Sequence, residues 1–248
     1  MSKAVSSYDD KYAYQNGYLN HFSTEALPNA LPKGQNTPQQ CPYGLYAEQL
    51  NGTPFTAPRV RNLRSWLYRI RPSAAHGVFR PYNTPTTADQ CLDADFAKNA
   101  TPKQFRWMPP PIPDTPTDFV DGLYCMVGAG SPQLRTGFAV HMYLCNKDMV
   151  DRAFTSADGD MLIVPQQGAL DVQTEMGNLH VKPLEIVVIP KGIRFAVKVS
   201  GPSRGYITEV FQGHFTIPDL GPIGANGLAN QRDFLTPVAA YEDVDKSF

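Results

Sequence analysis

Between residues 158 and 211 the chain alternates short apolar runs with turn signals, and this rhythm limits the folds that it can adopt. An apolar run at 161–165 ends at Gln166-Gln167-Gly168, and a second run at 184–189 ends at Pro190-Lys191-Gly192. Short runs rich in β-branched residues, separated by closely spaced turns, are typical of antiparallel strands in a sandwich or small barrel. No helical periodicity competes with them, so this stretch predicts a β domain.

Two of the runs alternate with a period of two. Apolar side chains occupy every second position in them: Leu179, Val181, Pro183, Phe195, Val197 and Val199. Because successive side chains of a strand point to opposite faces, one face of each strand should meet a core. The other face should meet water or a second layer.

The order of strand, Gly turn, strand, Pro-x-Gly and strand resembles the barrel unit of the cupin superfamily. This resemblance implies a mainly β fold, a cupin-like (RmlC-like) antiparallel β sandwich or barrel with a long N-terminal arm and loops. Metal-binding cupins carry His-x-His and a Glu in the first segment and a later His after Pro-x-Gly. Here Thr155-Ser156-Ala157-Asp158 replaces the His pair, Asp160-Met161 replaces the Glu, and Phe195 replaces the later His. The metal positions of the scaffold are therefore expected to be blank.

The length of 248 residues allows one large β domain or two small ones. We expect an N-terminal arm over residues 1–45, which are rich in Tyr, Asn, Pro and Gln, and one cupin-like domain over residues 46–248. The 23 prolines and 19 glycines disfavour long helices. A proline cluster at 109–116 predicts an extended connection that lies over the sheet.

Two further strands are predicted before this central block. The run 119–126 precedes Gly128-Ala129-Gly130, which we interpret as a loop because neither a helix signal nor Gly-Lys-Ser/Thr follows it. The run 137–145 is apolar almost throughout and predicts burial on both faces.

The net charge and the absence of targeting signals limit the classes of partner and the location that we expect for this protein. The formal net charge is −1 and no Lys/Arg run is present, which argues against nucleic acid and anionic membranes as partners. No apolar stretch reaches the ~18 residues of a membrane helix, and the N-terminus has no secretory pattern, so we expect a soluble cytoplasmic protein. The four cysteines are expected to be reduced and partly buried: Cys41, Cys91, Cys125 and Cys145.

The chemistry-bearing residues form no catalytic or metal-binding constellation in the sequence. The five histidines lack metal-ligand spacing: His21, His76, His141, His180 and His214. His141 lies in an apolar strand and predicts a hydrogen-bonded core histidine, whereas His180 and His214 predict surface or interface positions. Asp158 and Asp160 flank a glycine and predict a solvated turn. No cysteine has a nearby histidine in the sequence, so we assign no catalytic, cofactor-binding or metal-binding residue.

Several unusual runs carry a family resemblance. They are Leu31-Pro32-Lys33-Gly34-Gln35-Asn36-Thr37-Pro38-Gln39, Cys41-Pro42-Tyr43-Gly44-Leu45-Tyr46, Arg64-Ser65-Trp66-Leu67-Tyr68-Arg69-Ile70-Arg71-Pro72 and Asp219-Leu220-Gly221-Pro222-Ile223-Gly224-Ala225-Asn226-Gly227-Leu228-Ala229-Asn230. In this order they resemble the homogentisate 1,2-dioxygenase family. Read by itself, the run 219–230 predicts a long loop that covers an active site or makes a subunit contact.

The resemblance implies a ring-cleaving dioxygenase of tyrosine and phenylalanine catabolism. Its members use Fe(II), held by two His and one Glu, and O2 to convert homogentisate to maleylacetoacetate, and they suggest a homo-oligomer, a trimer-based hexamer. The iron ligands belong to a C-terminal half beyond Phe248, so this chain alone is expected to be inactive and to bind no iron.

Two interpretations of the short chain stay open. It is either the N-terminal part of the dioxygenase or a truncated, non-catalytic cupin-like pseudoenzyme or oligomerisation module. A standalone cupin isomerase or sugar-binding protein would need pocket residues that the sequence lacks.

Overall fold

The computed structural model describes residues 10–17, 23–31, 41–50, 53, 56–58, 61–63, 65–82, 104, 106, 108–221, 225–242 and 244. The chain divides into two compact units. The first comprises Met1–His21, Tyr82–Val238 and Glu242–Phe248, and the second Phe22–Pro81 and Ala239–Tyr241. The predicted division at residue 45 stays a prediction.

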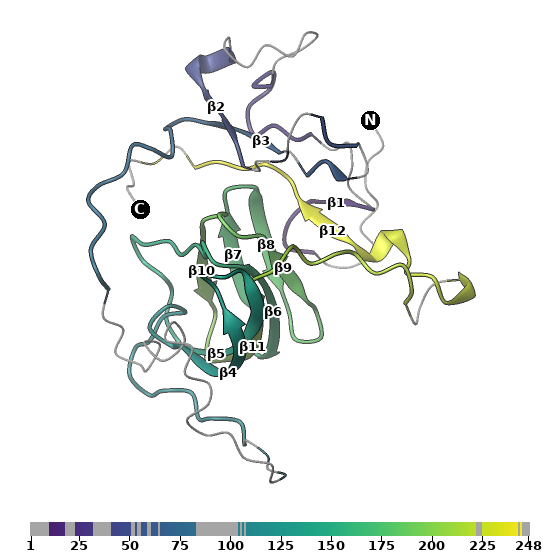
Figure 1. Ribbon diagram of the computed structural model, residues 1–248. Helices are drawn as coiled ribbons and strands as arrows, with labels where there is room; N and C mark the ends of the chain where they lie inside the picture. Colours follow the sequence, from purple (N-terminus) through teal and green to yellow (C-terminus); the bar gives the residue numbers. More distant parts are fainter. Residues whose placement is uncertain are drawn as a thin grey trace. The chain divides into compact units, whose positions relative to one another are not determined.

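Five antiparallel strands form the larger sheet of the first unit (Figure 1). In spatial order they are β4 (Leu123–Ser131), β5 (Thr136–Cys145), β11 (Ser203–Val210), β6 (Asp160–Gln167) and β9 (Val187–Ile189). Strand β11, late in the sequence, lies between β5 and β6 and pairs with both along almost its full length. The centre of this sheet therefore depends on pairings between residues far apart in the chain.

A three-stranded antiparallel sheet supplies the second layer. Its order is β10 (Phe195–Val199), β7 (Leu170–Thr174) and β8 (Gly177–Val181). Side chains of both sheets belong to one buried cluster, in which Ile163 and Ile207 of the large sheet join Val197 of the small one. The predicted mainly β antiparallel sandwich is confirmed.

The core follows from the alternation of side chains along β5 and β11. On β11 the odd-numbered residues are buried and the even-numbered ones are partly or fully exposed. Aromatic rings fill the space next to this face: Phe119 lies 5.2 Å from Tyr143 and 5.9 Å from Phe195, between ring centroids. Each fully buried large apolar side chain contributes about 1.5–3 kcal/mol. These rings therefore occupy the interior as packing residues.

The predicted loop at Gly128-Ala129-Gly130 is wrong, because these residues lie inside β4. Gly130 pairs with Gly137 of β5, and both have positive φ. A Cβ on Gly130 would lie 2.1 Å from the Thr136 carbonyl oxygen. The two glycines thus permit the backbones of β4 and β5 to approach closely, which is one of the uses of glycine within strands. The chain instead turns at residues 132–135.

Two further expectations for this region need correction. The segment 119–122 is a turn rather than the start of a strand, because the Asp118 carboxylate accepts hydrogen bonds from the Val120 and Asp121 amides at 3.0 Å. Strand β5 is not buried on both faces. Its first three residues are exposed and Val140 and Met142 are only partly covered, because no layer of the described chain covers the whole outer face.

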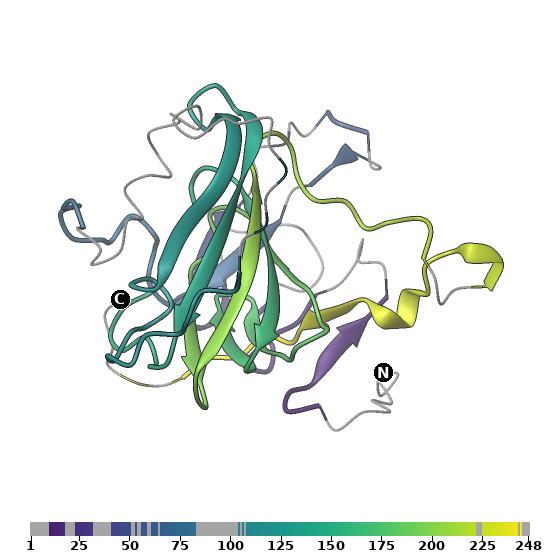
Figure 2. The same cartoon turned by 90° about the horizontal axis from the view of Figure 1, so that it is seen from below.

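Shorter elements complete the fold. Strand β1 (Tyr14–Asn16) pairs with β12 (Leu235–Pro237), and the two lie side by side as the purple and yellow strands of Figure 2. In the second unit, β2 (Tyr46–Gln49) pairs with β3 (Trp66–Arg69). Among the described residues, 3₁₀ helices occur at η1 (Pro42–Gly44), η5 (Ala225–Gly227) and η6 (Gln231–Asp233). Among the described residues, no helix has the length and apolar character needed to cross a membrane.

The three described cysteines are thiols, as predicted. Cys145 is buried, whereas Cys41 and Cys125 are partly buried. Cys91 lies outside the described residues.

The buried hydroxyl of Tyr143 generates a first prediction. Its ring packs over Gly205, and its Oη has no hydrogen-bond partner among the described residues. An unsatisfied buried polar group costs about 1–3 kcal/mol. Tyr143→Phe should therefore raise the free energy of unfolding in urea by about 1 kcal/mol. Tyr206→Phe, on the exposed face of β11, should leave the free energy of unfolding unchanged. A lower free energy of unfolding in Tyr143→Phe would show that the Tyr143 hydroxyl has a hydrogen-bond partner.

A second prediction concerns the segment that contains β1. Asp171 of β7 accepts from Lys11 at 2.6 Å, and the Tyr14 hydroxyl accepts from the His180 amide at 2.8 Å. Burial acts to raise the pKa of Asp171, but its hydrogen bonds to Lys11 and His180 prevail and lower it. The attachment should therefore persist above the unfolded value of about 3.9 and weaken as the pH falls through the lowered pKa of the folded state.

Asp171→Asn should speed amide exchange in Tyr14–Asn16 several-fold at pH 6, measured by mass spectrometry. The difference from the unmodified chain should shrink as the pH falls through the lowered pKa of Asp171, because the carboxylate then loses its charge. Asp151→Asn, at an exposed aspartate, is the matched control. Equal exchange in Asp171→Asn and the unmodified chain at pH 6 would show that the carboxylate does not hold the segment.

Candidate functional site

The inner face of the large sheet becomes polar toward one end. Inward-facing residues of β5 run from His141 to the apolar Tyr143 and Cys145, and Glu209 of β11 lies next to His141. His141 is 5% exposed and Glu209 is 7% exposed. We call Cys125, His141, Ser156 and Glu209 the interior polar cluster.

Glu209 is the best-bound member of this cluster. One carboxylate oxygen, Oε2, lies 2.9 Å from His141 Nε2, and the other, Oε1, accepts from the Ser156 hydroxyl at 2.5 Å. The same Ser156 oxygen accepts from the amides of Asp158 and Gly159 at 3.2 Å. Both carboxylate oxygens of Glu209 therefore have a hydrogen-bond partner inside the sandwich.

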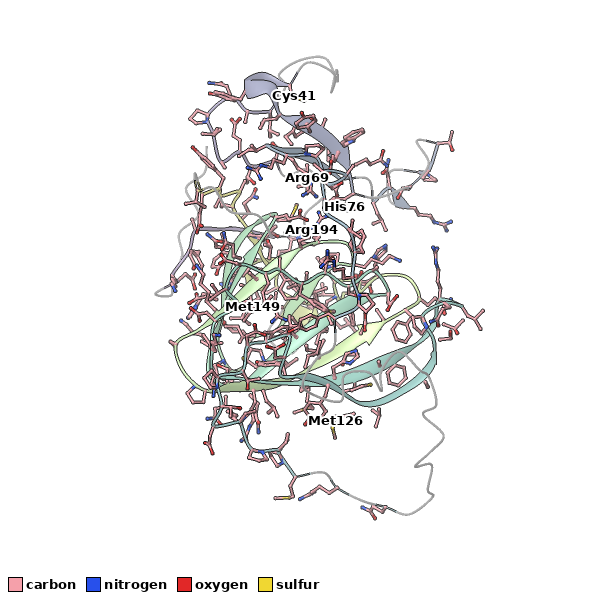
Figure 3. All side chains as sticks on the ribbon, turned by 90° about the vertical axis from the view of Figure 1, so that its left-hand side faces the viewer. Cys41, Arg69, His76, Met126, Met149 and Arg194 are labelled. Carbon is pink, nitrogen blue, oxygen red and sulfur yellow. The ribbon has the colours of Figure 1, made fainter. Side chains whose placement is uncertain are left out.

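Cys125 joins the cluster from the neighbouring strand. It lies directly opposite His141 in the β4–β5 pairing, next to a bulge at which the register shifts between Cys125 and Val127. The bulge residue, Met126, lies on the outer side of the sheet, opposite the buried Met149 (Figure 3). A bulge re-aims the side chains beside it. Here the irregularity lies immediately next to the thiol that faces His141.

The cluster favours a charged imidazole. Burial acts to lower the pKa of His141, but hydrogen bonds to Cys125 and Glu209 outweigh it and raise the pKa to about 9. Burial, with the nearby Glu209 charge, raises the pKa of Asp158. An imidazolium between a thiol and a carboxylate can hold or deliver a proton next to sulfur, the arrangement that activates cysteine nucleophiles.

The structure confirms His141 as a hydrogen-bonded core histidine, but its neighbours left no sign in the sequence. Cys125 lies 16 positions before His141, and Glu209 lies 68 positions after it. Only strand pairing brings them together. The only sequence pattern that pointed to this cluster was the alternation of inward and outward side chains, which places His141 and Glu209 on the core faces of their strands.

Two other histidines, for which surface or interface positions were predicted, pair with carboxylates. His180 Nδ1 lies 2.8 Å from Asp171, and His214 Nδ1 lies 3.0 Å from Asp160. Both imidazoles are partly buried. His76 is exposed and stacks on Phe79, with 4.5 Å between ring centroids. His21 lies outside the described residues.

The predicted solvated turn at Asp158 and Asp160 is wrong for Asp160. This residue starts β6 and is 1% exposed. Its carboxylate accepts from the Lys191 amide at 3.0 Å and the Phe215 amide at 3.2 Å, besides its contact with His214. Backbone donors from two distant segments thus replace water around it. Asp160 is a tether for the chain after β11.

The residues at the cupin metal positions do not fit an iron ion. Phe195 is part of the apolar core, Asp160 is occupied by the donors above, and the Ser156 hydroxyl is bound to Glu209. In the part of the chain that the structure describes, no group of three or more His, Cys, Asp or Glu side chains could hold a metal ion. No step of a reaction is therefore assigned to a metal at these positions.

Comparison with known sequences finds close similarity. A family model described as homogentisate 1,2-dioxygenase N-terminal matches residues 13–248. A curated homogentisate 1,2-dioxygenase from Oryza sativa subsp. japonica is 57% identical over 244 residues. The match covers 95% of this chain and 51% of the relative, so the chain spans about half the length of that protein.

Solved structures show partial likeness. A cupin-2 domain protein from Shewanella frigidimarina aligns with 20% identity and a TM-score of 0.27, over 29% of this chain and 70% of its own. KdgF from Halomonas sp. aligns with 16% identity and a TM-score of 0.30, over 37% of this chain and 82% of its own. Both alignments leave more than half of this chain unmatched.

The buried pair of His141 and Glu209 generates a third prediction. Removing one partner of a buried ion pair leaves the other uncompensated and costs about 3–5 kcal/mol. Glu209→Gln and His141→Gln should each destabilise the chain by about 2–4 kcal/mol. The double variant should lose about 1–3 kcal/mol less than the sum of the two, measured by urea denaturation. Additive losses would show that the two side chains do not interact.

Proposed function

Since this chain belongs to the homogentisate 1,2-dioxygenase N-terminal family, we propose that it is the N-terminal part of a dioxygenase that opens the ring of homogentisate. The reaction of the whole protein consumes O2 and yields maleylacetoacetate, a step of tyrosine and phenylalanine catabolism in the cytoplasm. The observation that carries this proposal is the 57% identity over 244 residues to a relative of that name.

The chain supplies a scaffold rather than the iron centre of that dioxygenase. Phe119, Tyr143 and Phe195 fill the middle of the sandwich, and the polar cluster beside them is engaged in its own hydrogen bonds. The Fe(II) ligands, two His and one Glu in this family, would then lie in the half of the protein that these 248 residues do not cover. This division of labour supports the expectation that the chain alone is inactive.

A second candidate function is a non-catalytic interaction module. It is favoured by the outer face of the large sheet, where Phe138, Val188 and Tyr206 remain at least 40% exposed. Apolar side chains gathered on one sheet face are typical of a surface that packs against another domain or subunit. In either function the protein would be a homo-oligomer, for which the family suggests a trimer-based hexamer.

Mass and oxygen uptake test the proposal. The protein purified from its source should have a mass roughly twice 27.4 kDa, since the match spans about half of the relative. It should consume O2 with homogentisate. The 248-residue chain, purified and supplied with Fe(II), should show no uptake above background.

Other outcomes of this test are informative. A native mass of 27.4 kDa would favour the interaction module. Stoichiometric iron and oxygen uptake in the 248-residue chain would overturn the assignment of the iron centre to the other half.

A further inference from the structure

The interior polar cluster has no part in the proposed function, yet it combines a thiol, an imidazole and a carboxylate. Cys125, His141 and Glu209 come from β4, β5 and β11, three consecutive strands of the large sheet. The cysteine and the histidine are direct neighbours across the strands. Apolar side chains would suffice to pack this part of the core, so packing alone does not explain why a thiol, an imidazole and a carboxylate meet there.

We propose that Cys125 is held as a thiolate by His141 and Glu209, and that it is a site of oxidation by small hydroperoxides such as hydrogen peroxide. This inference concerns the chain's own residues and does not rest on the dioxygenase assignment.

Hydrogen bonding fixes the direction of the imidazole. Each ring nitrogen of an imidazolium donates one hydrogen bond. Nε2 lies 2.9 Å from Glu209 and the ring also hydrogen-bonds Cys125, so we infer that Nδ1 is the nitrogen that faces the sulfur. The same sulfur lies 3.5 Å from the Val127 carbonyl oxygen, to which the protonated thiol donates. Glu209 itself cannot turn away, because Ser156 binds its other oxygen. The carboxylate therefore orients the ring, and the ring presents its second proton to the thiol.

The charges around the imidazole favour ionisation of the thiol. His141 faces Cys125 from β4 and Glu209 from β11, while Asp158, in the segment before β6, is close to Glu209. Burial and the Glu209 charge raise the pKa of Asp158. A cationic histidine beside a cysteine lowers the pKa of the thiol from about 8.5 to about 3.5–7.5 in known cases.

The location of Cys125 at the edge of the large sheet favours access of small molecules to its sulfur. Strand β4 is the edge strand of the large sheet, and Cys125 is partly exposed beside the bulge. Cys145 provides a contrast within the same sheet. It is fully buried, and burial, with the charges of Asp118 and Asp148, raises its pKa to about 12. Cys145 should therefore be inert under conditions in which Cys125 reacts.

The oxidation step balances without a further reactant. The Cys125 thiolate attacks one oxygen of hydrogen peroxide, an S–O bond forms and the O–O bond breaks. Sulfur loses two electrons, and the peroxide is reduced. The leaving hydroxide takes the proton of the His141 imidazolium and departs as water. The products are a sulfenic acid at Cys125 and a neutral His141.

The test measures the reactivity of each cysteine in the full 248-residue chain. Alkylation by iodoacetamide is followed at Cys125 and Cys145 by peptide mass spectrometry between pH 5.5 and 9.5. A thiol of pKa about 8.5 is about 3% ionised at pH 7, whereas one of pKa 7 is half ionised. Cys125 should therefore react at least about tenfold faster at pH 7 than an ordinary thiol, with an apparent pKa below 7.5.

A second measurement identifies the oxidised product. After exposure to hydrogen peroxide, dimedone, which traps sulfenic acids, should label Cys125 and leave Cys145 unlabelled. Cys125→Ser should abolish that label.

Two matched variants separate activation from simple packing. His141→Gln should slow alkylation of Cys125 about tenfold at pH 7 and move its apparent pKa to 8.5 or above. His180→Gln removes another carboxylate-bound histidine and should leave the Cys125 profile unchanged. Near-ultraviolet circular dichroism checks that both variants are folded.

The proposal is overturned by any of three results. They are an apparent pKa of 8.5 or above for Cys125 in the unmodified chain, no reaction of Cys125 in the folded protein at any pH, or an unchanged profile in a folded His141→Gln variant.

Discussion

The packing of β11 between β5 and β6 is the constraint on which the rest of the structure depends. This strand joins β5 to β6 at the centre of the large sheet although it follows β5 by some sixty positions, and its odd-numbered side chains form one wall of the core. Such long-range pairing carries a large loop-closure entropy, which the burial of apolar side chains must offset. The aromatic rings of Phe119 and Phe195 belong to the same buried cluster as Ile207 of this strand.

The same alternation that builds the core also carries polar side chains into it. Glu209 has the inward parity of Ile207 on β11, and His141 has that of Tyr143 on β5. Buried charges are tolerated only when they are paired and hydrogen-bonded, and here His141 and Ser156 meet that condition for Glu209. A thiol becomes the third member because Cys125 lies directly opposite His141 in the β4–β5 pairing.

Several features could be predicted from local sequence, and the predictions that failed did so because contacts with distant segments overrode the local preference. The turn at Gly168 followed from glycine, which adopts positive φ readily, and the core faces of β8 and β10 followed from their alternation. At Gly128–Gly130, the same preference served close strand pairing instead of a turn. At Asp160, backbone donors from distant segments replaced the water that an exposed aspartate would bind.

By itself the sequence determined the mainly β class, the family of the chain and the burial of His141, because periodicity and motifs are local properties. Only the tertiary structure decided that Cys125, His141 and Glu209 meet, because strand order and register depend on the whole sheet rather than on any one strand. It also decided that Phe195 and Asp160 serve packing and tethering at positions where the resemblance to cupins would place metal ligands.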